Sequence, residues 1–375
     1  MQKILVHICC SVDSHYFLQK LQKEYPNSQL IGFFYDPNIH PYSEYSLRLL
    51  DVQRSCNLLN IELIEGPYDY RGWLESVRGY ENEPEKGARC SLCFDRRFEV
   101  SAKKAQEIGA THFTSTLLTS PKKSIEQLKA SGDSLAKNFG IKFLAPDYRQ
   151  SNGTQEQNII AKEAKLYRQN YCGCLYALKQ QREQQNRVLE ELFCPISKQI
   201  QPNSIESKIE LYKKRIALEE QAVKYEIIKN RFLNWRLLFG IVKEKKKTIP
   251  AHILPYSTLK KSYSRGKVER SVGEIYYFNR DEIKFITLKH YNTLSNKEYQ
   301  SIEELLYNPP DFEDELVIRS HIVTSPYDLS TIFVVKEIPK GKVELKVEAK
   351  IYEDVKEELI IQESPLNLSI NSKKD

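Results

Sequence analysis

The cysteines of this sequence follow a pattern that suits metal binding. Six of the eight form three close pairs, Cys9–Cys10, Cys90–Cys93 and Cys172–Cys174. A turn of two or three residues brings the sulfurs of such a pair close together, so each pair can direct two thiolates at one metal ion. Asp13 follows Cys10 by one helical turn and adds a carboxylate oxygen. The six paired cysteines and Asp13 are therefore the candidate metal ligands.

Two kinds of metal site fit these pairs. Spacing alone favours a structural zinc site of four cysteines about as strongly as an iron–sulfur cluster. The cluster is favoured because the pairs are scattered along the chain, because six thiolates exceed the ligands of one tetrahedral zinc, and because a closed zinc site seldom needs an oxygen ligand. A thioredoxin-like motif at Cys90–Cys93 is disfavoured, since Gly87–Arg89 precede it in place of a strand. The lone Cys56 and Cys194 are predicted to be small buried apolar residues.

The elements that position these residues alternate between strand and helix. Apolar runs predict strands over 3–8, 30–35, 61–65, 112–116 and 142–145, and helical periodicity predicts helices over 14–24, 44–59, 91–108, 122–139, 155–169 and 176–193. This alternation predicts an α/β fold with a parallel, doubly wound sheet. Ligands of such sheets bind at the carboxyl ends of the strands, so chemistry is expected after Ile8, where Cys9 and Cys10 stand, and after Tyr35.

The length of the chain indicates more than one domain. Its 375 residues exceed the roughly 250–300 residues at which a single core stops growing. We expect the α/β domain over 1–194, a helical connector over 195–265 that includes a long helical stretch at Ile205–Phe239, and a mixed α+β accessory domain over 266–363. The accessory domain is predicted to contain strands at 273–278, 282–288, 331–335 and 343–352, and residues 364–375 are predicted to be a disordered tail.

The composition indicates a soluble globular protein, with 41% hydrophobic and 28% charged residues. The N-terminal apolar run is too short for a signal sequence. No segment approaches the roughly 20 apolar residues that span a bilayer. We therefore expect a cytoplasmic protein with no membrane partner, in a compartment where disulfides are rare and clustered cysteines indicate metal.

Four blocks of the sequence match one known family in order and separation. They are His7-Ile-Cys9-Cys10-Ser-Val-Asp13, Phe33–Pro41 followed by Glu44-Tyr45 and Arg48, Thr116–Lys123, and Tyr167–Cys174. Together they resemble the QueH family of cobalamin-independent epoxyqueuosine reductases over about residues 3–185. Two departures from the family pattern are Ser11-Val12 in place of Ala-Pro and Asp36 in place of Asn.

The resemblance implies a Rossmann-like domain of the adenine-nucleotide α-hydrolase (PP-loop) type, with a 4Fe–4S cluster and a neighbouring mononuclear iron. It implies that epoxyqueuosine at the wobble position of tRNA is reduced to queuosine, the last step of queuosine biosynthesis, with electrons from a donor that the sequence does not identify. Cys9, Cys10, Cys90, Cys93, Cys172 and Cys174 would divide between the cluster and the second iron, with Asp13 as a ligand or close partner. How the sulfurs divide stays open.

Other residues of the matching blocks are candidates for contact with the substrate or for proton donation. They are Lys123, Arg168 and Tyr171, for which structural roles are at least equally favoured. His7 precedes the metal loop within a strand, and we predict a buried, hydrogen-bonded histidine there in preference to a ligand. His40 and Tyr45 follow the second strand, a favourable place for substrate.

Two other functions compete with reduction. ATP-dependent tRNA sulfur-transfer enzymes share the PP-loop fold, but they need a Gly-rich loop after the first strand so that backbone N–H groups can approach pyrophosphate. The loop between Ile8 and Ser14 has no glycine, which argues against ATP. A zinc-stapled tRNA-binding protein is the non-catalytic alternative, and iron with acid-labile sulfide in the purified protein would exclude it.

The region after Pro195 contains the strongest lysine run of the chain, within a protein of net charge +6. RNA loops are commonly held by basic side chains on phosphates and by aromatic rings stacked on bases. A solvated charged face on an accessory or dimerising domain is the somewhat more favoured interpretation. The candidate RNA-binding residues are Lys243, Lys245, Lys246, Lys247, Lys260, Lys261, Arg265, Tyr256 and Tyr263.

Overall fold

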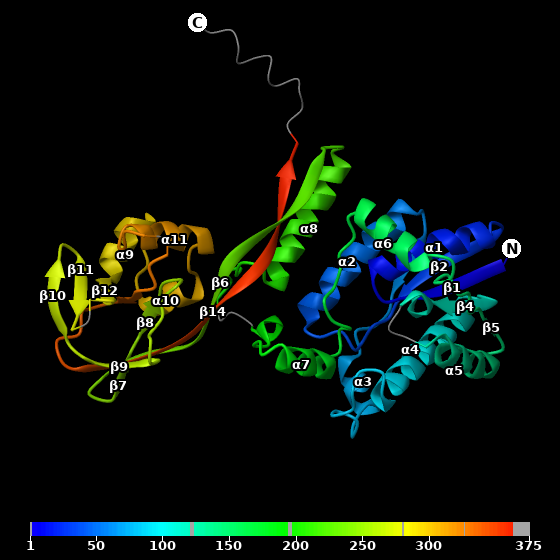
Figure 1. Ribbon diagram of the computed structural model, residues 1–375, viewed down its shortest axis with the longest axis horizontal. Helices are drawn as coiled ribbons and strands as arrows, with labels where there is room; N and C mark the ends of the chain where they lie inside the picture. The colour runs from blue at the N-terminus through cyan, green and yellow to red at the C-terminus, as the bar shows by residue number, and fades with distance from the viewer. Residues whose placement is uncertain (1, 121–123, 194–196, 280, 326, 363–375) are drawn as a thin grey trace, which may run out of the picture. The chain divides into compact units, whose positions relative to one another are not determined.

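The computed structural model describes residues 2–120, 124–193, 197–279, 281–325 and 327–362 (Figure 1). In this part of the chain the residues form two compact units. The α/β unit consists of residues up to Leu192 together with Lys208–Ile227 and residues 361–362, and the second unit consists of Phe193–Ser207 and Ile228–Ile360. The predicted tail over 364–375 lies outside the described residues.

A five-stranded sheet forms the centre of the α/β unit. Its strand order is β3-β2-β1-β4-β5, and every neighbouring pair is parallel. Residues Ile4–Ile8 of the central strand are fully buried, because helices cover both faces of a doubly wound sheet. The predicted parallel α/β fold is confirmed. The strands are β1 (Gln2–Ile8), β2 (Ser28–Phe34), β3 (Glu62–Glu65), β4 (His112–Ser115) and β5 (Lys142–Phe143).

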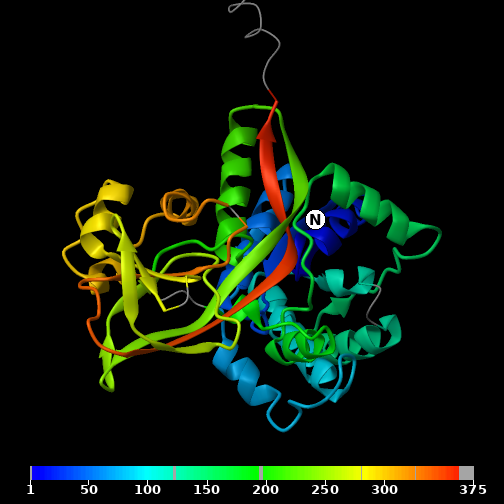
Figure 2. The same cartoon turned by 60° about the vertical axis from the view of Figure 1, so that its left-hand side comes forward.

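The helices of this unit form two layers on the sheet (Figures 1 and 2). Helix α1 packs against α2 and α6 in one layer, and α4 packs against α5 in the other. The helices predicted over 155–169 and 176–193 end early, at Glu163 and Gln184, where Lys165 and Asn186 take positive φ angles of 49° and 51°. The helical bounds are α1 (Ser11–Glu24), α2 (Tyr42–Leu58), α3 (Tyr70–Ser76), α4 (Ala88–Glu107), the 3₁₀ turn η1 (Thr116–Thr119), α5 (Ile125–Asn138), α6 (Gly153–Glu163), α7 (Leu175–Gln184) and η2 (Glu190–Leu192).

Helix α8 (Ile205–Glu220) belongs to the α/β unit over most of its length, although it follows the predicted boundary at 194. Arg215 of this helix donates to the carboxylate of Asp51 on α2 at 2.5 Å, and both side chains are fully buried. Arg54 and Glu219 form a second ion pair between α2 and α8 at 2.7 Å. The fold of the first unit is therefore completed by a helix from beyond residue 194.

The helical stretch predicted over Ile205–Phe239 is wrong after Glu220. Ala222 takes a positive φ of 54°, and strand β6 (Tyr225–Glu244) begins three residues later. Residues 225–244 are rich in aromatic and β-branched side chains, which favour strands, and at Asn230–Leu233 half-buried and exposed positions alternate with the two-residue period of a strand.

The second unit contains two sheets, in the orders β10-β11-β12-β13-β8 and β7-β6-β14-β9. Strands β12 and β13 are parallel, and three helices connect them. The apolar faces of the two sheets pack together through residues such as Phe285, Phe333 and Val343. The bounds are β7 (Lys247–Ile249), β8 (Ala251–Ile253), β9 (Tyr263–Gly266), β10 (Val268–Val272), β11 (Ile275–Phe278), β12 (Ile283–Thr287), α9 (Leu288–Ser295), α10 (Ile302–Tyr307), α11 (Phe312–Ser320), β13 (Thr331–Val335) and β14 (Val343–Ile361).

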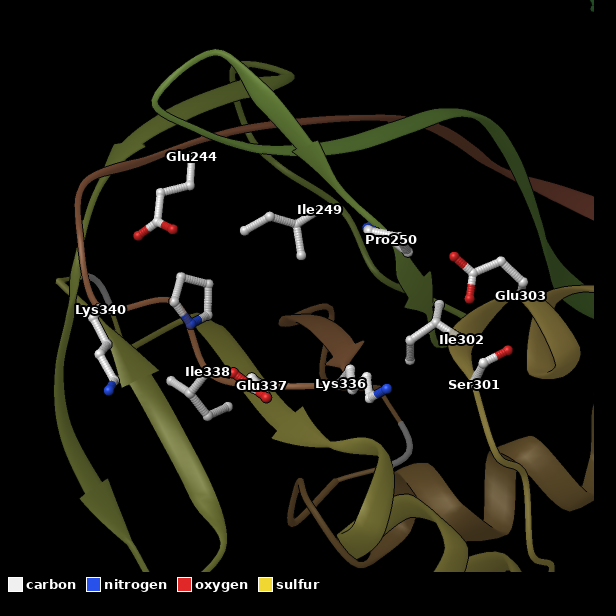
Figure 3. A pocket seen from close by; sticks show the side chains of 11 residues that line it. Glu244, Ile249, Pro250, Ser301, Ile302, Glu303, Lys336, Glu337, Ile338 and Lys340 are labelled. Atoms are coloured by element: carbon white, nitrogen blue, oxygen red, sulfur yellow. The ribbon is translucent and has the colours of Figure 1, made fainter.

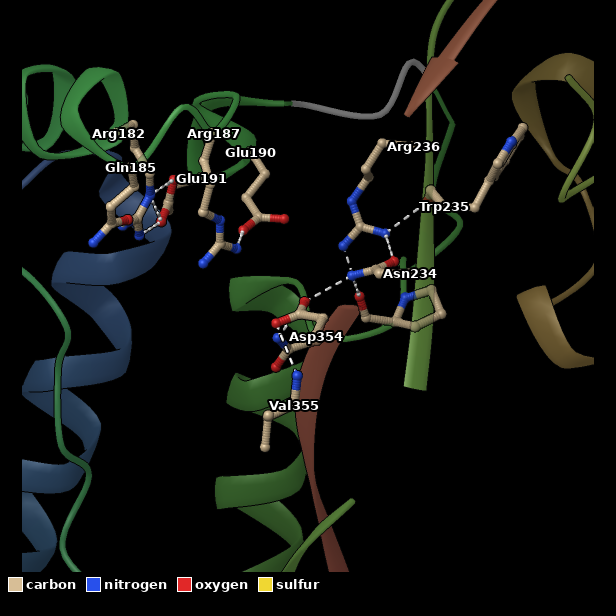
Figure 4. A network of polar contacts seen from close by, with 12 residues as sticks. Arg182, Gln185, Arg187, Glu190, Glu191, Asn234, Trp235, Arg236, Asp354 and Val355 are labelled. Atoms are coloured by element: carbon tan, nitrogen blue, oxygen red, sulfur yellow. Dashed lines mark hydrogen bonds and ion pairs between the residues drawn. The ribbon is translucent and has the colours of Figure 1, made fainter. Parts of the chain in front are cut away.

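Hydrogen bonds and ion pairs of buried polar side chains hold irregular segments in place within each unit (Figure 4). In the α/β unit, Arg182 of α7 is 2% exposed and donates from Nε to Glu191 at 3.0 Å, which ties η2 back to α7. In the second unit, the carboxylate of Asp354 accepts from Asn203 at 2.8 Å and from Asn234 at 2.9 Å. The Glu191 and Asn203 contacts each hold an irregular segment to a regular element of the same unit, whereas the Asn234 contact joins β6 to β14.

The buried pair between Asp51 and Arg215 generates a stability prediction. Arg215→Ala leaves the buried carboxylate of Asp51 with only the longer ion pair to Arg54 at 4.0 Å, which we expect to lower the free energy of unfolding of the α/β unit by about 3–5 kcal/mol. Arg71→Ala is the matched control, because Arg71 is 92% exposed where it pairs with Glu75, and we expect a loss below about 1 kcal/mol. Urea unfolding of the full-length variants measures both, and equal losses would contradict the assigned role of α8.

Candidate metal centre

The carboxyl edge of the parallel sheet gathers the first part of the site. Cys9 and Cys10 follow β1 directly, and Thr116 follows β4, the neighbour of β1. The Sγ atom of Cys9 lies 3.7 Å from Oγ1 of Thr116. The prediction that chemistry would be found where β1 ends is thus supported by geometry, because this edge brings residues 107 positions apart into contact.

Cys9, Cys10 and Asp13 form a compact group of potential ligands. Their ligand atoms lie within 4.8 Å of one another. Cys9 Sγ is 3.9 Å from Cys10 Sγ and 3.9 Å from Oδ2 of Asp13. The other carboxylate oxygen of Asp13 accepts from the amide of the buried Gln157 at 2.8 Å, which orients the carboxylate toward the thiols.

A second group of thiols comes from α4 and α7. Cys90 and Cys93 lie in the first two turns of α4, and Cys174 precedes α7. Cys93 and Cys174 pack in one buried cluster with Trp73 of α3. The indole N–H of Trp73 has no hydrogen-bond acceptor at ordinary distance among the described residues, yet it lies near enough to Cys93 to favour the thiolate.

The Cys172–Cys174 turn is held from two sides. Gly173 has a φ of 110°, which a residue with a side chain rarely adopts. Its carbonyl accepts from the backbone N–H of His40 at 2.9 Å. The guanidinium of Arg48 donates to the Tyr171 carbonyl at 2.9 Å and to the Cys172 carbonyl at 3.1 Å. The turn is therefore fixed against the segment that follows β2.

The buried Arg97 of α4 interacts electrostatically with sulfurs of both thiol groups. Its guanidinium forms a buried ion pair with Asp36, which follows β2. Burial by itself would lower the pKa of the Arg97 guanidinium. The nearby carboxylate of Asp36 and the sulfurs of Cys93, Cys9 and Cys172 have a larger, opposite effect, so the pKa is raised. Burial raises the pKa of Asp36 to about 6 even though Arg97 opposes this shift. The positive charge of Arg97 therefore interacts with one cysteine of each of the three pairs.

Three of the thiols, those of Cys10, Cys93 and Cys174, have pKa values above the usual range. The contact with Cys9, together with burial and the nearby Asp13, raises the pKa of Cys10 well above its usual value. Burial raises the pKa of Cys174 to about 12 and also raises that of Cys93, where Arg97 opposes it. A bound cation would stabilise these thiolates, and the soft sulfur donors with one carboxylate suit iron or zinc. The residues present therefore fit a thiolate-held metal group.

Several other predicted residues have partners that define their roles. His7 is buried, with Nδ1 2.8 Å from Ser115 Oγ and Nε2 3.2 Å from the Tyr35 carbonyl, so the predicted hydrogen-bonded histidine is confirmed. Burial lowers the pKa of His7 well below its usual value. The Tyr171 hydroxyl donates to the His40 carbonyl at 2.6 Å.

The remaining predictions divide between confirmed, corrected and untestable ones. Cys56 is fully buried, and burial raises its pKa to about 12, as expected of an isolated core thiol. Tyr45 is also buried and donates to Glu65 at 3.0 Å, so its predicted place in the substrate site is wrong. Arg168 is exposed and donates to Asn158 at 2.9 Å. Lys123 and Cys194 lie outside the described residues.

Sequence reasoning missed Arg97 and Trp73. Arg97 stands four residues after Cys93, so it lies on the same face of α4. That spacing is a usable signal, because a cation one turn from a thiolate ligand can balance its charge. Trp73 lies on the short helix α3, outside the four matching blocks, and only packing against Cys93 and Cys174 reveals it.

A groove of about 600 Å³ lies in the second unit (Figure 3). It is lined by carboxylates and ammonium groups, among them Glu244, Glu303 and Lys336, together with aliphatic side chains such as Ile249. Glu244 also accepts from the backbone N–H of Gly341 at 2.7 Å. No thiol or imidazole lines the groove, so it offers none of the metal-binding chemistry of the α/β unit.

The fold and the site together define a class: an α/β protein with a thiol-rich candidate metal site at the carboxyl edge of a parallel sheet. The family model described as "Epoxyqueuosine reductase QueH" matches residues 4–180. A relative of that name from Helicobacter pylori is 41% identical over 349 residues, which is 89% of this chain and 94% of the relative. The chain belongs to the epoxyqueuosine reductase QueH family, and the predicted resemblance is confirmed. Its activity is accordingly epoxyqueuosine reduction.

Shorter relatives match about half of the chain. Epoxyqueuosine reductase QueH from Acinetobacter baylyi is 39% identical over 47% of this chain and 81% of its own length. The protein of the same name from Thermotoga maritima is 32% identical over 50% of this chain and 96% of its own length. Among solved structures, the U34-tRNA thiolase NcsA from Methanococcus maripaludis overlaps with a TM-score of 0.34 at 15% identity, over 58% of this chain and 73% of that one. A similarity this low carries no argument about function.

No helix in the described part of the chain combines the length and apolarity needed to cross a bilayer.

The two thiol groups generate a prediction about metal content. Cys10→Ala, Cys93→Ala and Cys172→Ala should each lower the bound metal and abolish reductase activity, because each removes one sulfur of a converging pair. Cys56→Ala is the control and should keep the full metal content at a stability cost of about 1 kcal/mol, since it removes one buried atom. Metal analysis of anaerobically purified protein measures the effect. A loss in Cys56→Ala as large as in Cys10→Ala would overturn the assignment.

Proposed function

We propose that this chain reduces the epoxide of epoxyqueuosine in tRNA with a 4Fe–4S cluster and a neighbouring mononuclear iron, both held by the cysteines of a Rossmann-like, PP-loop-type domain. The observation that supports this most directly is the compact group of Cys9, Cys10 and Asp13, whose ligand atoms lie within 4.8 Å of one another. A single tetrahedral zinc would use four sulfurs at most. Six thiols and a carboxylate exceed that number.

The reaction defines what the site must supply. Conversion of an epoxide to an alkene takes up two electrons and two protons and releases one water. When bound, the cluster supplies electrons one at a time, and an iron with an open position supplies Lewis acidity. The electrons come from a separate donor, because no side chain of the site can provide them.

The chain's own residues bind and orient the metal group and the substrate. Asp13 is oriented by Gln157 and is available as an iron ligand beside Cys9. Arg97 offsets the negative charge of the thiolates, and Trp73 can donate to the Cys93 sulfur, a contact that tunes reduction potential. The proposed catalytic role of Asp13 is that of a metal ligand or close partner, whereas Lys123 and Tyr171 remain candidates for substrate contact or proton donation. The Tyr171 hydroxyl would have to leave the His40 carbonyl to act in this way.

A row of aromatic rings, here called the aromatic strip, leads toward the thiols and offers surfaces on which a nucleotide base could stack. We define it as His40, Tyr42, Tyr68, Tyr70, Trp73 and Tyr176. Ring centroids are 5.0 Å apart for Tyr42–Tyr68, 6.0 Å for Tyr68–Tyr70 and 5.8 Å for Tyr70–Trp73. The outer ring of Tyr42 is 58% exposed, whereas Trp73 is fully buried beside Cys93. Unpaired bases of an anticodon loop stack on such rings.

The proposed cofactor generates a direct test. Protein reconstituted with iron and sulfide under anaerobic conditions should be brown, absorb broadly near about 400 nm and bleach with dithionite. It should then reduce epoxyqueuosine in tRNA without ATP. A colourless protein that contains only zinc, or a requirement for ATP, would favour the tRNA-binding or sulfur-transfer alternatives instead.

The aromatic strip generates a second test. Tyr42→Leu should raise the KM for tRNA about 5- to 150-fold, because stacking of one base on one ring contributes about 1–3 kcal/mol. Its kcat and iron content should stay close to those of the parent protein. Tyr80→Leu is the control, because Tyr80 is 41% exposed and outside the strip. Similar KM values for the two variants would exclude the strip as a substrate contact.

A further inference from the structure

The second unit has an open sheet face that the reductase chemistry does not use. In the sheet β7-β6-β14-β9, one face packs on the core through Val242, Val343 and Leu345, which are fully buried. Gly240 also faces the core, because a side chain there would meet Ile253 at 2.2 Å. Successive residues of a strand point to opposite faces, so the residues between these positions define the outer face.

Rings and a lysine form a row across three strands of that outer face. Phe239 of β6 is 44% exposed and Tyr263 of β9 is 51% exposed. Lys346 of β14 is the register partner of Tyr263, and its ammonium group lies 5.1 Å from the centroid of the Phe239 ring. The order β6-β14-β9 therefore places one cation between two exposed aromatic rings. We call these three residues the platform.

Basic residues predominate around the platform. Lys243 and Lys350 stand four residues after Phe239 and Lys346, and Arg265 stands two residues after Tyr263. These even spacings along a strand place all three on the face of the platform. Glu344 and Glu348 share the face, and Arg265 pairs with Glu344 at 3.6 Å. The β6–β7 turn adds Lys245, Lys246 and Lys247, all exposed. The face therefore has a positive excess next to its rings.

We propose that this platform binds unpaired nucleotides of the tRNA substrate, with bases on Phe239 and Tyr263 and a phosphate on Lys346. Exposed rings on an antiparallel sheet accept bases of any sequence, and cations between the rings accept the backbone. The proposal rests on the proposed function, which supplies tRNA as the partner, and extends it to the second unit. It also corrects the predicted RNA-binding set, because the Tyr256 hydroxyl donates to the Leu233 carbonyl and its ring packs against Trp235.

The test uses full-length holoprotein and an unmodified tRNA transcript as the probe. The double variant Phe239→Ala/Tyr263→Ala should weaken binding by at least about tenfold, because one stacked base contributes about 5- to 150-fold. Lys346→Gln should lower the slope of log affinity against log salt by about 0.7, the loss of one phosphate contact. The matched controls are Tyr307→Ala, 60% exposed on α10, and Lys289→Gln, exposed on α9. Both should bind as the parent protein does.

The outcomes separate this inference from the proposed function. In the double variant, kcat at saturating tRNA and iron content should match the parent protein, while KM rises. Parental affinity and salt slope in the variants would overturn the platform. A change in oligomeric state by light scattering without a change in RNA affinity would also overturn it and would identify the face as a protein interface. A parent protein that binds tRNA through the platform but reduces nothing would refute the proposed function alone.

Discussion

A buried positive charge organises the metal centre. Arg97 is 2% exposed, and a guanidinium in such surroundings requires compensating negative charge. Asp36 provides one carboxylate, and the sulfurs of Cys9, Cys93 and Cys172 are near enough to provide the remainder once they are ionised. The same charge lowers the cost of assembling several thiolates in one place. A metal bound to these cysteines would stabilise the thiolates, and the thiolates in turn would stabilise the charge of Arg97.

The fold satisfies this constraint by bringing loops together at one edge. Cys9 and Asp36 follow the neighbouring strands β1 and β2, whereas Arg97 and Cys93 come from α4, which packs on β1. The Cys172 turn reaches the edge through Arg48. Each ligand group therefore lies on a short segment fixed by a regular element. This preorganisation matters because ordering long loops upon metal binding would cost conformational entropy and weaken the binding.

The two compact units do not correspond to two consecutive pieces of the chain. Helix α8 returns to the α/β unit and covers the buried Asp51 with Arg215. A fragment that ends near residue 194 would lack this helix, so variants of the intact chain are the better test of the second unit. The relatives from Acinetobacter baylyi and Thermotoga maritima match about half of this chain, whereas the Helicobacter pylori relative matches 89% of it. The platform belongs to the part that the family model does not cover.

The sequence by itself determined the parallel α/β fold, the family and the candidate ligands, because strand and helix periodicity and paired cysteines are local patterns. It also identified His7 and Cys56 as core residues. Predictions from the sequence were wrong where long-range packing determines the structure. Residues 225–239 form a strand because β6 pairs with β14, and Tyr45 is buried by neighbouring residues. Only the tertiary structure showed that Arg97 pairs with Asp36, that Trp73 packs on Cys93, and that Arg215 completes the first unit. These contacts join residues far apart in the chain, and no local pattern encodes such pairs.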